Sequence, residues 1–260
     1  MLDTRVIGRD EQMDYANYLG ASGFDTARFT ADLTDPNRSL LGVDQMNWLG
    51  LQLAQSDTTW DMLGQQVLMG RMNIPAPLVL GQVSFTQYSA LLFKAQTAPA
   101  TLTPQEQFVL AQPAIPYNLD AWDGYAVARE TLLGTARALD KNLVVLAGDT
   151  HNAWASDLTD FAGNRVGVEF ATSSVTSPGF EEYFPAENPL AVAAGLTQII
   201  GPLQYADTAR RGFMLVTATA QSCRAEWRYV STVKSRTYTV ANGPALRMLP
   251  GAANRKLVPG

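Results

Sequence analysis

The sequence predicts an α/β fold with a strand-rich C-terminal third. Residues 124–139 carry apolar side chains at helical spacing, and the apolar run that follows at 142–147 (NLVVLA) stops at Gly148, which indicates a helix followed by a buried strand. Shorter runs then predict mainly antiparallel strands; they lie at residues 155–158, 167–172, 212–219, 225–231 and 236–240. We therefore expect a sandwich or a wound α/β sheet.

The N-terminal half is less regular. Its patterns predict a strand at residues 2–7, a helical turn or two at 10–17, an irregular segment at 21–38, a helix at 44–54 capped by Asp44, and a buried strand at 60–69. Residues 71–123 contain several prolines and little periodicity, which predicts a long loop with short helices. Further on, residues 188–200 predict a helix, and 163–164 and 231–235 predict hairpin turns.

Composition narrows the possible functions. The chain has 260 residues, 47% hydrophobic and 17% charged, which is enough for the core of one large domain or two small ones. A net charge of −5 argues against a nucleic-acid-binding surface, but not against a phosphate ester held by a metal ion or an arginine. The single cysteine, Cys223, excludes an intrachain disulfide and a CxxC zinc site, and the single histidine, His151, limits histidine chemistry to one position.

The sequence predicts no membrane span. The most apolar stretch, residues 67–83, is interrupted by Arg71, Asn73 and two prolines, whereas a spanning helix needs about 20 apolar residues. The first residues, MLDTRVIGRDEQ, lack the apolar core of a signal peptide. These features leave the compartment open.

The strongest candidate for a functional site is the segment LVVLAGDTHNAW at residues 143–154. A buried strand runs into Gly148 and then presents Asp149 and His151, and loops at such strand ends commonly bind ligands. If the backbone stays extended, Asp149 and His151 face the same side and can hold one metal ion such as iron, manganese or zinc. A turn-capping aspartate beside a histidine hydrogen-bonded in the core is an interpretation of about equal weight.

Weaker hypotheses attach to three other features. Cys223 lies in an expected strand and is more typical of a buried apolar residue than of a nucleophile. The hydroxyl-rich stretch 172–179 could line an anion site, although a hydrogen-bonded loop is the commoner role, and Arg210 and Arg211 could meet an anionic substrate or simply be solvated. Serine hydrolysis through His151 is disfavoured because the chain has no GxSxG-type nucleophile elbow.

Several segments, in the same order along the chain, resemble the PhoD-like (alkaline phosphatase D) metallophosphatases. They are MLDTRVIGRD (1–10), LLGVDQMNWL (40–49), TWDMLGQQVLM (59–69), AWDGYAVARETLL (121–133), LVVLAGDTHNAWASDL (143–158), EFATSSVTSPG (169–179) and YADTARRGFMLV (205–216). Any one of these matches is weak, but the ordered set is specific and spans most of the chain.

The resemblance implies a metallophosphoesterase-type sandwich of two β-sheets flanked by helices, with a metal centre at the strand ends. It implies metal-dependent hydrolysis of phosphate monoesters or diesters, metal ions that include iron and calcium, and an exported protein in many members. By position in the GDTH motif it makes Asp149 and His151 metal ligands. It also places Arg5 and Asn152 near the site, where they contact the substrate or support the ligands.

The chain departs from the family pattern at its N-terminal side. The family's GDxxY-type and DDHE-type segments, which supply further ligands, would precede the LDTR segment and do not occur in this sequence, and an Asn-Pro-His near residue 200 is replaced by Ile-Gly-Pro. We therefore expect residues 1–260 to be the C-terminal portion of the family's domain, with the sandwich incomplete at its N-terminus and a missing N-terminal half as partner. The alternative is a non-catalytic fragment or a partner-binding remnant of the fold.

Overall fold

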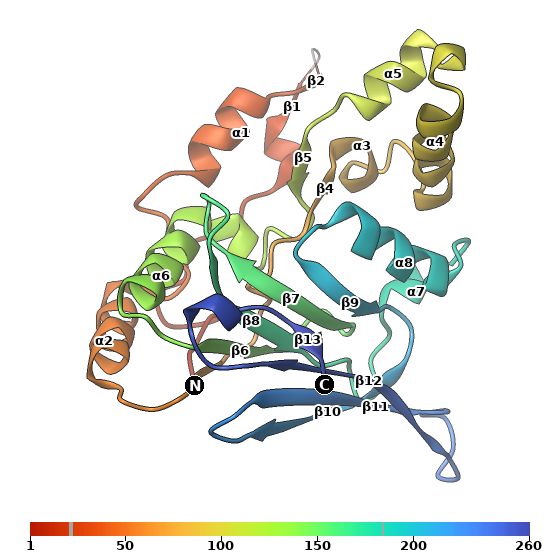
Figure 1. Cartoon of the computed structure of the whole chain (residues 1–260). Coiled ribbons are helices and arrows are strands. Elements are labelled where there is room, and N and C mark those ends of the chain that lie inside the picture. The colour runs from red at the N-terminus through yellow and green to blue at the C-terminus, as the bar shows by residue number, and fades with distance from the viewer. Residues whose placement is uncertain (21–22, 184) are drawn as a thin grey trace.

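Two β-sheets face each other, and helices cover the outer face of the larger one (Figure 1). The computed structural model describes residues 1–20, 23–183 and 185–260. The larger sheet has the strand order β3-β6-β8-β7-β9, and the smaller sheet has the order β10-β11-β12-β13. This arrangement confirms the α/β class and the two-sheet sandwich expected from the sequence.

Three neighbouring strands of the larger sheet are paired in parallel. They are β3 (Asp61–Gly64), β6 (Leu143–Ala147) and β8 (Arg165–Ala171). The strand β7 (Ala153–Thr159) pairs antiparallel with β8 and with the edge strand β9 (Leu203–Asp207). The parallel strands β3, β6 and β8 therefore end at the same edge of the sheet, where β7 begins.

The smaller sheet is entirely antiparallel. Its strands are β10 (Arg211–Ala218), β11 (Cys223–Val230), β12 (Val240–Met248) and β13 (Val258–Pro259). Along β11 every second residue is buried, as the two-residue period of a strand requires. The buried set packs against the larger sheet, and Phe170 of β8 meets Trp227 of β11 edge to face with 6.2 Å between ring centroids.

A second apolar core joins the other face of the larger sheet to three helices. These are α2 (Gly42–Gln55), α6 (Ala126–Ala138) and α8 (Pro189–Ile199). The other described α-helices are α1 (Thr26–Leu33), α3 (Ala76–Val79), α4 (Phe85–Thr97), α5 (Pro104–Leu110) and α7 (Phe180–Tyr183). Two small two-stranded antiparallel sheets pair β1 (Leu19–Gly20) with β2 (Gly23–Phe24) and β4 (Asn73–Pro75) with β5 (Ala114–Pro116). In the described part of the chain, no helix is both long and apolar enough to cross a membrane.

The predicted strand at residues 2–7 is wrong. The carboxylate of Asp3 accepts hydrogen bonds of 2.8 Å from the backbone N–H groups of Arg5 and Val6, so the side chain closes a turn and takes the donors that a strand would offer to a neighbour. One backbone contact with the sheet remains, from the N–H of Leu2 to the carbonyl of Gly64 at 2.8 Å.

Other boundaries also differ from the prediction. The segment 21–38, expected to be irregular, contains α1, which Asp25 caps through the N–H of Arg28; residues 21 and 22 lie outside the described residues. The strand expected at 60–69 is shorter and is confined to β3. The strand expected at 236–240 lies further along the chain, as β12, and β9 was not predicted. Asp44 lies inside the first turn of α2 instead of capping it.

Candidate functional site

The turn at residues 148–152 crosses the end of β8. It leaves β6 and enters β7, and β8 lies between these two strands in the sheet. Backbone hydrogen bonds of 3.0 Å, from the N–H of Gly148 to the carbonyl of Gln66 and from the N–H of Thr172 to the carbonyl of Ala147, fix the turn to the segments that follow β3 and β8. The turn therefore lies at the sheet edge where the sequence predicted a site.

The backbone of this turn is not extended. Asp149 and His151 have φ values of 70° and 62°, in the left-handed region that non-glycine residues seldom adopt, and the N–H of Thr150 bonds back to the carbonyl of Gly148 at 2.8 Å. The premise that Asp149 and His151 share the face of an extended segment is therefore wrong, because neither residue has extended backbone. Each left-handed residue costs on the order of 1–3 kcal/mol, and such strain is concentrated at functional sites.

Asp149 forms an ion pair with Arg5. The guanidinium of Arg5 bridges the carboxylates of Asp149 and Asp120, with 2.5 Å to the latter, and Arg9 also binds Asp120. Partial burial lowers the pKa of Arg5, but hydrogen bonds to both carboxylates outweigh it, so the pKa lies above its usual range. The structure thus places Arg5 beside Asp149 and adds Asp120, which the sequence gave no reason to select because it lies 115 residues from Arg5.

Among the described residues, the imidazole of His151 has one hydrogen-bond partner. Its Nδ1 lies 2.9 Å from the carbonyl oxygen of Pro178. A carbonyl oxygen only accepts hydrogen bonds, so Nδ1 carries a proton, and in the neutral imidazole Nε2 then keeps its lone pair. Metal-binding histidines have this arrangement, in which the nitrogen that does not bind the metal donates to a carbonyl or carboxylate.

Asn152 is fully buried and holds the turn together. Its amide donates to the carbonyl of Thr150 at 2.6 Å, and its Oδ1 accepts the backbone N–H of Phe180 at 3.1 Å. The hydroxyl of Thr150 in turn accepts the indole N–H of Trp154 at 2.8 Å. Of the two roles that the resemblance implied for Asn152, this geometry suits support of the neighbouring residues better than direct contact with a substrate.

The donor set of this chain suits part of a metal site. The neutral Nε2 of His151 and the carboxylate of Asp149 are ligands that iron, manganese and zinc accept. Among the described residues, however, no three or more His, Cys, Asp or Glu side chains are grouped so that they could hold a metal ion. A metal ion bound at Asp149 and His151 would therefore need further ligands.

The weaker sequence hypotheses resolve in favour of structural roles. Cys223 is fully buried in the core between the sheets, and burial raises its pKa to about 11, so it is an apolar residue of the core. Arg210 binds Asp207 at 2.5 Å, and Arg211 forms an ion pair with Glu181. Glu181 was not selected from the sequence, which places it 30 residues from its partner.

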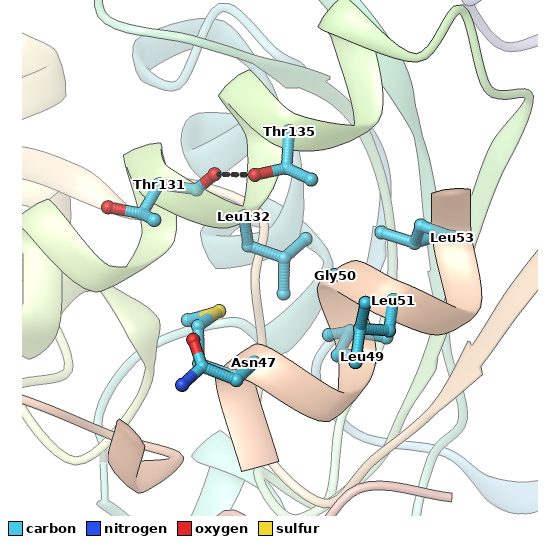
Figure 2. A pocket seen from close by; sticks show the side chains of 9 residues that line it. Asn47, Leu49, Gly50, Leu51, Leu53, Thr131, Leu132 and Thr135 are labelled. Carbon is cyan, nitrogen blue, oxygen red and sulfur yellow. Dashed lines mark hydrogen bonds between the residues drawn. The ribbon is translucent and has the colours of Figure 1, made fainter. Parts of the chain in front are cut away.

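An apolar groove between α2 and α6 lies apart from these residues (Figure 2). It has a volume of about 440 Å³, and the leucines of α2 face Leu132 of α6 across it, beside the hydrogen bond of 2.8 Å from the hydroxyl of Thr135 to the carbonyl of Thr131 (Figure 2). Its lining contains no acid, base or cysteine, so it offers no group for acid–base or nucleophilic chemistry.

Comparison with known proteins identifies the family. The model of the family described as PhoD-like phosphatase matches residues 1–227, and the chain belongs to this family. Alkaline phosphatase D of Bacillus subtilis (strain 168) is 31% identical over 150 residues, which cover 56% of this chain and 20% of that protein. A solved structure titled "Structure of PhoD" has the same fold, with a TM-score of 0.68 at 24% identity, and the match covers 99% of this chain and 40% of that one. The chain thus spans less than half the length of either relative.

Proposed function

We propose that the protein hydrolyses phosphate esters at a metal centre that includes Asp149 and His151. The observation that carries the proposal is the orientation of His151 in a chain of the PhoD-like phosphatase family: its Nδ1 is committed to Pro178, and no other described residue hydrogen-bonds to its Nε2. Arg5 is already paired with Asp149 and Asp120. When a phosphate ester binds, the guanidinium of Arg5 can release one of these carboxylates and bind the phosphate oxygens instead.

We propose iron and calcium as the metal ions, because the resemblance to the family implies these two. Iron accepts imidazole together with carboxylate, whereas calcium prefers oxygen ligands, so we assign iron to the ligand pair that includes His151. When bound, such an ion would stabilise the negative charge that develops on the phosphoryl oxygens. The substrate is a phosphate monoester or diester, and hydrolysis assays with one ester of each kind distinguish the two.

The further ligands are proposed to come from the part of the family fold that this chain does not match. The relatives are longer, and the match with the solved structure covers 40% of its chain. An association with an N-terminal half would complete the ligand set. The alternative is a non-catalytic chain that binds a partner through this fold, and the small number of clustered metal-ligating side chains in the described residues favours it.

The decisive experiment compares the chain alone, the chain extended by the family's GDxxY and DDHE segments, and the His151→Ala variant of each. Metal content and hydrolysis of p-nitrophenyl phosphate and bis-p-nitrophenyl phosphate are measured with iron and calcium and with chelator. We expect the extended form to turn over one of the esters, and the variant to lose about 100-fold or more. The control is Lys94→Ala, which removes a 2.7 Å ion pair with Glu106 between α4 and α5. Turnover that survives His151→Ala would refute the proposal, and an inactive extended form would favour the non-catalytic alternative.

A further inference from the structure

The loop at residues 174–181 packs against both residues of the turn that follow Thr150. The carbonyl of Pro178 meets Nδ1 of His151 at 2.9 Å, the N–H of Phe180 reaches Oδ1 of Asn152 at 3.1 Å, and the N–H of Ser174 contacts the carbonyl of His151 at 3.4 Å. The imidazole is therefore oriented by a backbone atom of this loop, and whatever fixes the loop also fixes the ring.

Glu181 and Arg211 fasten the end of this loop to β10. The carboxylate of Glu181 accepts the N–H of Gly179 at 3.1 Å and forms an ion pair with Arg211, the first residue of β10. The next residue of β10 donates its N–H to the carbonyl of Ser174 at 3.0 Å, so both ends of the loop are held by the same strand. Burial raises the pKa of Glu181, but the hydrogen bond from Arg211, the backbone hydrogen bonds that include the one from Gly179, and the charge of Arg211 together outweigh it. The pKa therefore lies below its usual value, and the pair is charged at neutral pH.

The loop has little room to move at Gly179. A Cβ added to Gly179 would lie 2.5 Å from Oδ1 of Asn152 and 2.9 Å from the carbonyl oxygen of Thr208. The peptide that carries the carbonyl of Pro178 ends at this residue. Close packing on one side and the Glu181–Arg211 ion pair on the other therefore determine the direction of the carbonyl that His151 meets.

We propose that Glu181 and Arg211 are positioning residues that hold His151 as the Nδ1–H tautomer through the carbonyl of Pro178. In this tautomer Nε2 keeps its lone pair and is available to an electrophile such as a metal ion. The metal ion as the partner of Nε2 rests on the proposed function. The control of the tautomer by Glu181 and Arg211 does not depend on it.

The single histidine makes a direct test possible. Nitrogen NMR of the chain labelled with 15N-histidine reports which ring nitrogen carries the proton, and the spectra are compared at a pH where they show only the neutral imidazole. We expect the wild-type chain to show the Nδ1–H form. Arg211→Ala and Glu181→Gln should each shift the ratio of the two tautomers by about five-fold or more toward Nε2–H, the change expected for the loss of one hydrogen bond.

Two further variants separate positioning from general damage. Arg228→Ala removes a comparable ion pair with Glu226 on β11, at 3.0 Å, and should leave the ratio unchanged. Arg211→Lys keeps the charge and should restore most of the wild-type ratio. Backbone NMR spectra establish that each variant is folded, and Glu181→Gln, which retains an acceptor for Gly179, covers the case in which Arg211→Ala unfolds.

The inference is overturned if the wild-type histidine carries its proton on Nε2, or if folded Glu181→Gln, and Arg211→Ala where it folds, keep the wild-type tautomer as firmly as Arg228→Ala does. Neither result depends on phosphatase activity or bound metal. If the variants shift the tautomer and the protein hydrolyses no phosphate ester, the positioning role of Glu181 and Arg211 is supported and the proposed function is refuted.

Discussion

The carboxylate of Glu169, on β8, accepts a hydrogen bond of 2.8 Å from the backbone N–H of Gly70. Its other oxygen accepts the N–H of Met69 at 2.6 Å, so one buried side chain holds the segment that follows β3 against the middle of the larger sheet. The guanidinium of Arg129, from α6, binds the carbonyl of Met69 at 2.7 Å on the same segment. Charged groups from a strand and a helix thus fix a stretch that has no regular hydrogen-bond ladder of its own.

Gly70→Ala should destabilise the protein by about 1–3 kcal/mol, because the new methyl group would overpack a filled site. An added Cβ would lie 2.7 Å from Cβ and Oγ of Ser156 and 2.9 Å from Oε2 of Glu169. Urea unfolding followed by tryptophan fluorescence measures the change. Gly134→Ala is the matched control: it lies within α6 with nothing within 4 Å of the added atom, and should stabilise by about 0.5–1 kcal/mol. Equal effects of the two substitutions would contradict the packing described for Gly70.

Glu169 should make the protein less stable as the pH rises from about 4.5 to about 7. Burial raises its pKa from 4.5 to about 7, despite the hydrogen bonds from Met69 and Gly70, so the folded state binds its proton more tightly than the unfolded state. That stabilisation is complete below pH 4.5 and is lost as the pH rises through the folded pKa, with a slope of at most about 1.4 kcal/mol per pH unit for one proton.

The measurement is the free energy of unfolding in urea across this pH range, for the wild type and for Glu169→Gln. The variant should be less stable at low pH, because its amide can accept only one of the two backbone N–H groups, and its pH slope should be smaller. A residual slope of the same sign is expected from Asp123 and Asp157, since burial raises the pKa of both. An unchanged slope in Glu169→Gln would show that this carboxylate does not titrate in the range.

His151→Gly should be more stable than His151→Ala by about 1 kcal/mol. Both substitutions remove the same contact with Pro178, and only glycine adopts the left-handed backbone, with φ of 62°, without strain. Thermal unfolding of the two variants measures the difference. At an ordinary helical position the order is reversed, so Gly134→Ala again serves as the reference; if alanine is the more stable substitution at residue 151, the left-handed conformation is not retained in solution.

Cys223 should react with thiol reagents only when the chain unfolds. Its side chain is fully buried, and burial raises its pKa to about 11, which lowers the thiolate fraction about 100-fold compared with a thiol of the usual pKa of 9.0. Alkylation followed by mass spectrometry should therefore be at least about 100-fold slower in the native chain than in urea. Rapid native labelling would mean that the core between the two sheets opens readily.

The sequence predicted the elements whose patterns are local. The helix near residues 124–139 was identified from the helical spacing of its apolar residues, and the strand at 142–147 from its uninterrupted apolar run. Both signals come from residues close together in the sequence. The strand at 2–7 failed because the polar side chain of Asp3 competes for backbone donors, an effect that hydrophobic periodicity does not register. The strand expected at 236–240 was misplaced relative to β12 because the residues of β12 are mostly exposed or half-buried and show no clean alternation.

The turn that the sequence singled out as the candidate site lies at the end of β6, but its conformation differs from the extended one that we expected. A buried strand that ends in a glycine and is followed by polar residues indicated the turn. No feature of the sequence indicated the left-handed backbone at Asp149 and His151. The partners Asp120 and Glu181 come from segments far away in sequence, and only the folded chain brings them to Arg5 and Arg211. Assignment of Asp149 and His151 as metal ligands stays a prediction.

The route of the chain over β8 fixes the length of the turn at residues 148–152. Strands in a sheet are about 4.8 Å apart, so this turn must span roughly 10 Å sideways and reverse direction before β7 begins. Deleting or adding one residue would change the position of His151 relative to β8 and separate its imidazole from the carbonyl of Pro178. Natural variants should therefore differ in length in the exposed connection between β11 and β12, and keep the same number of residues between β6 and β7.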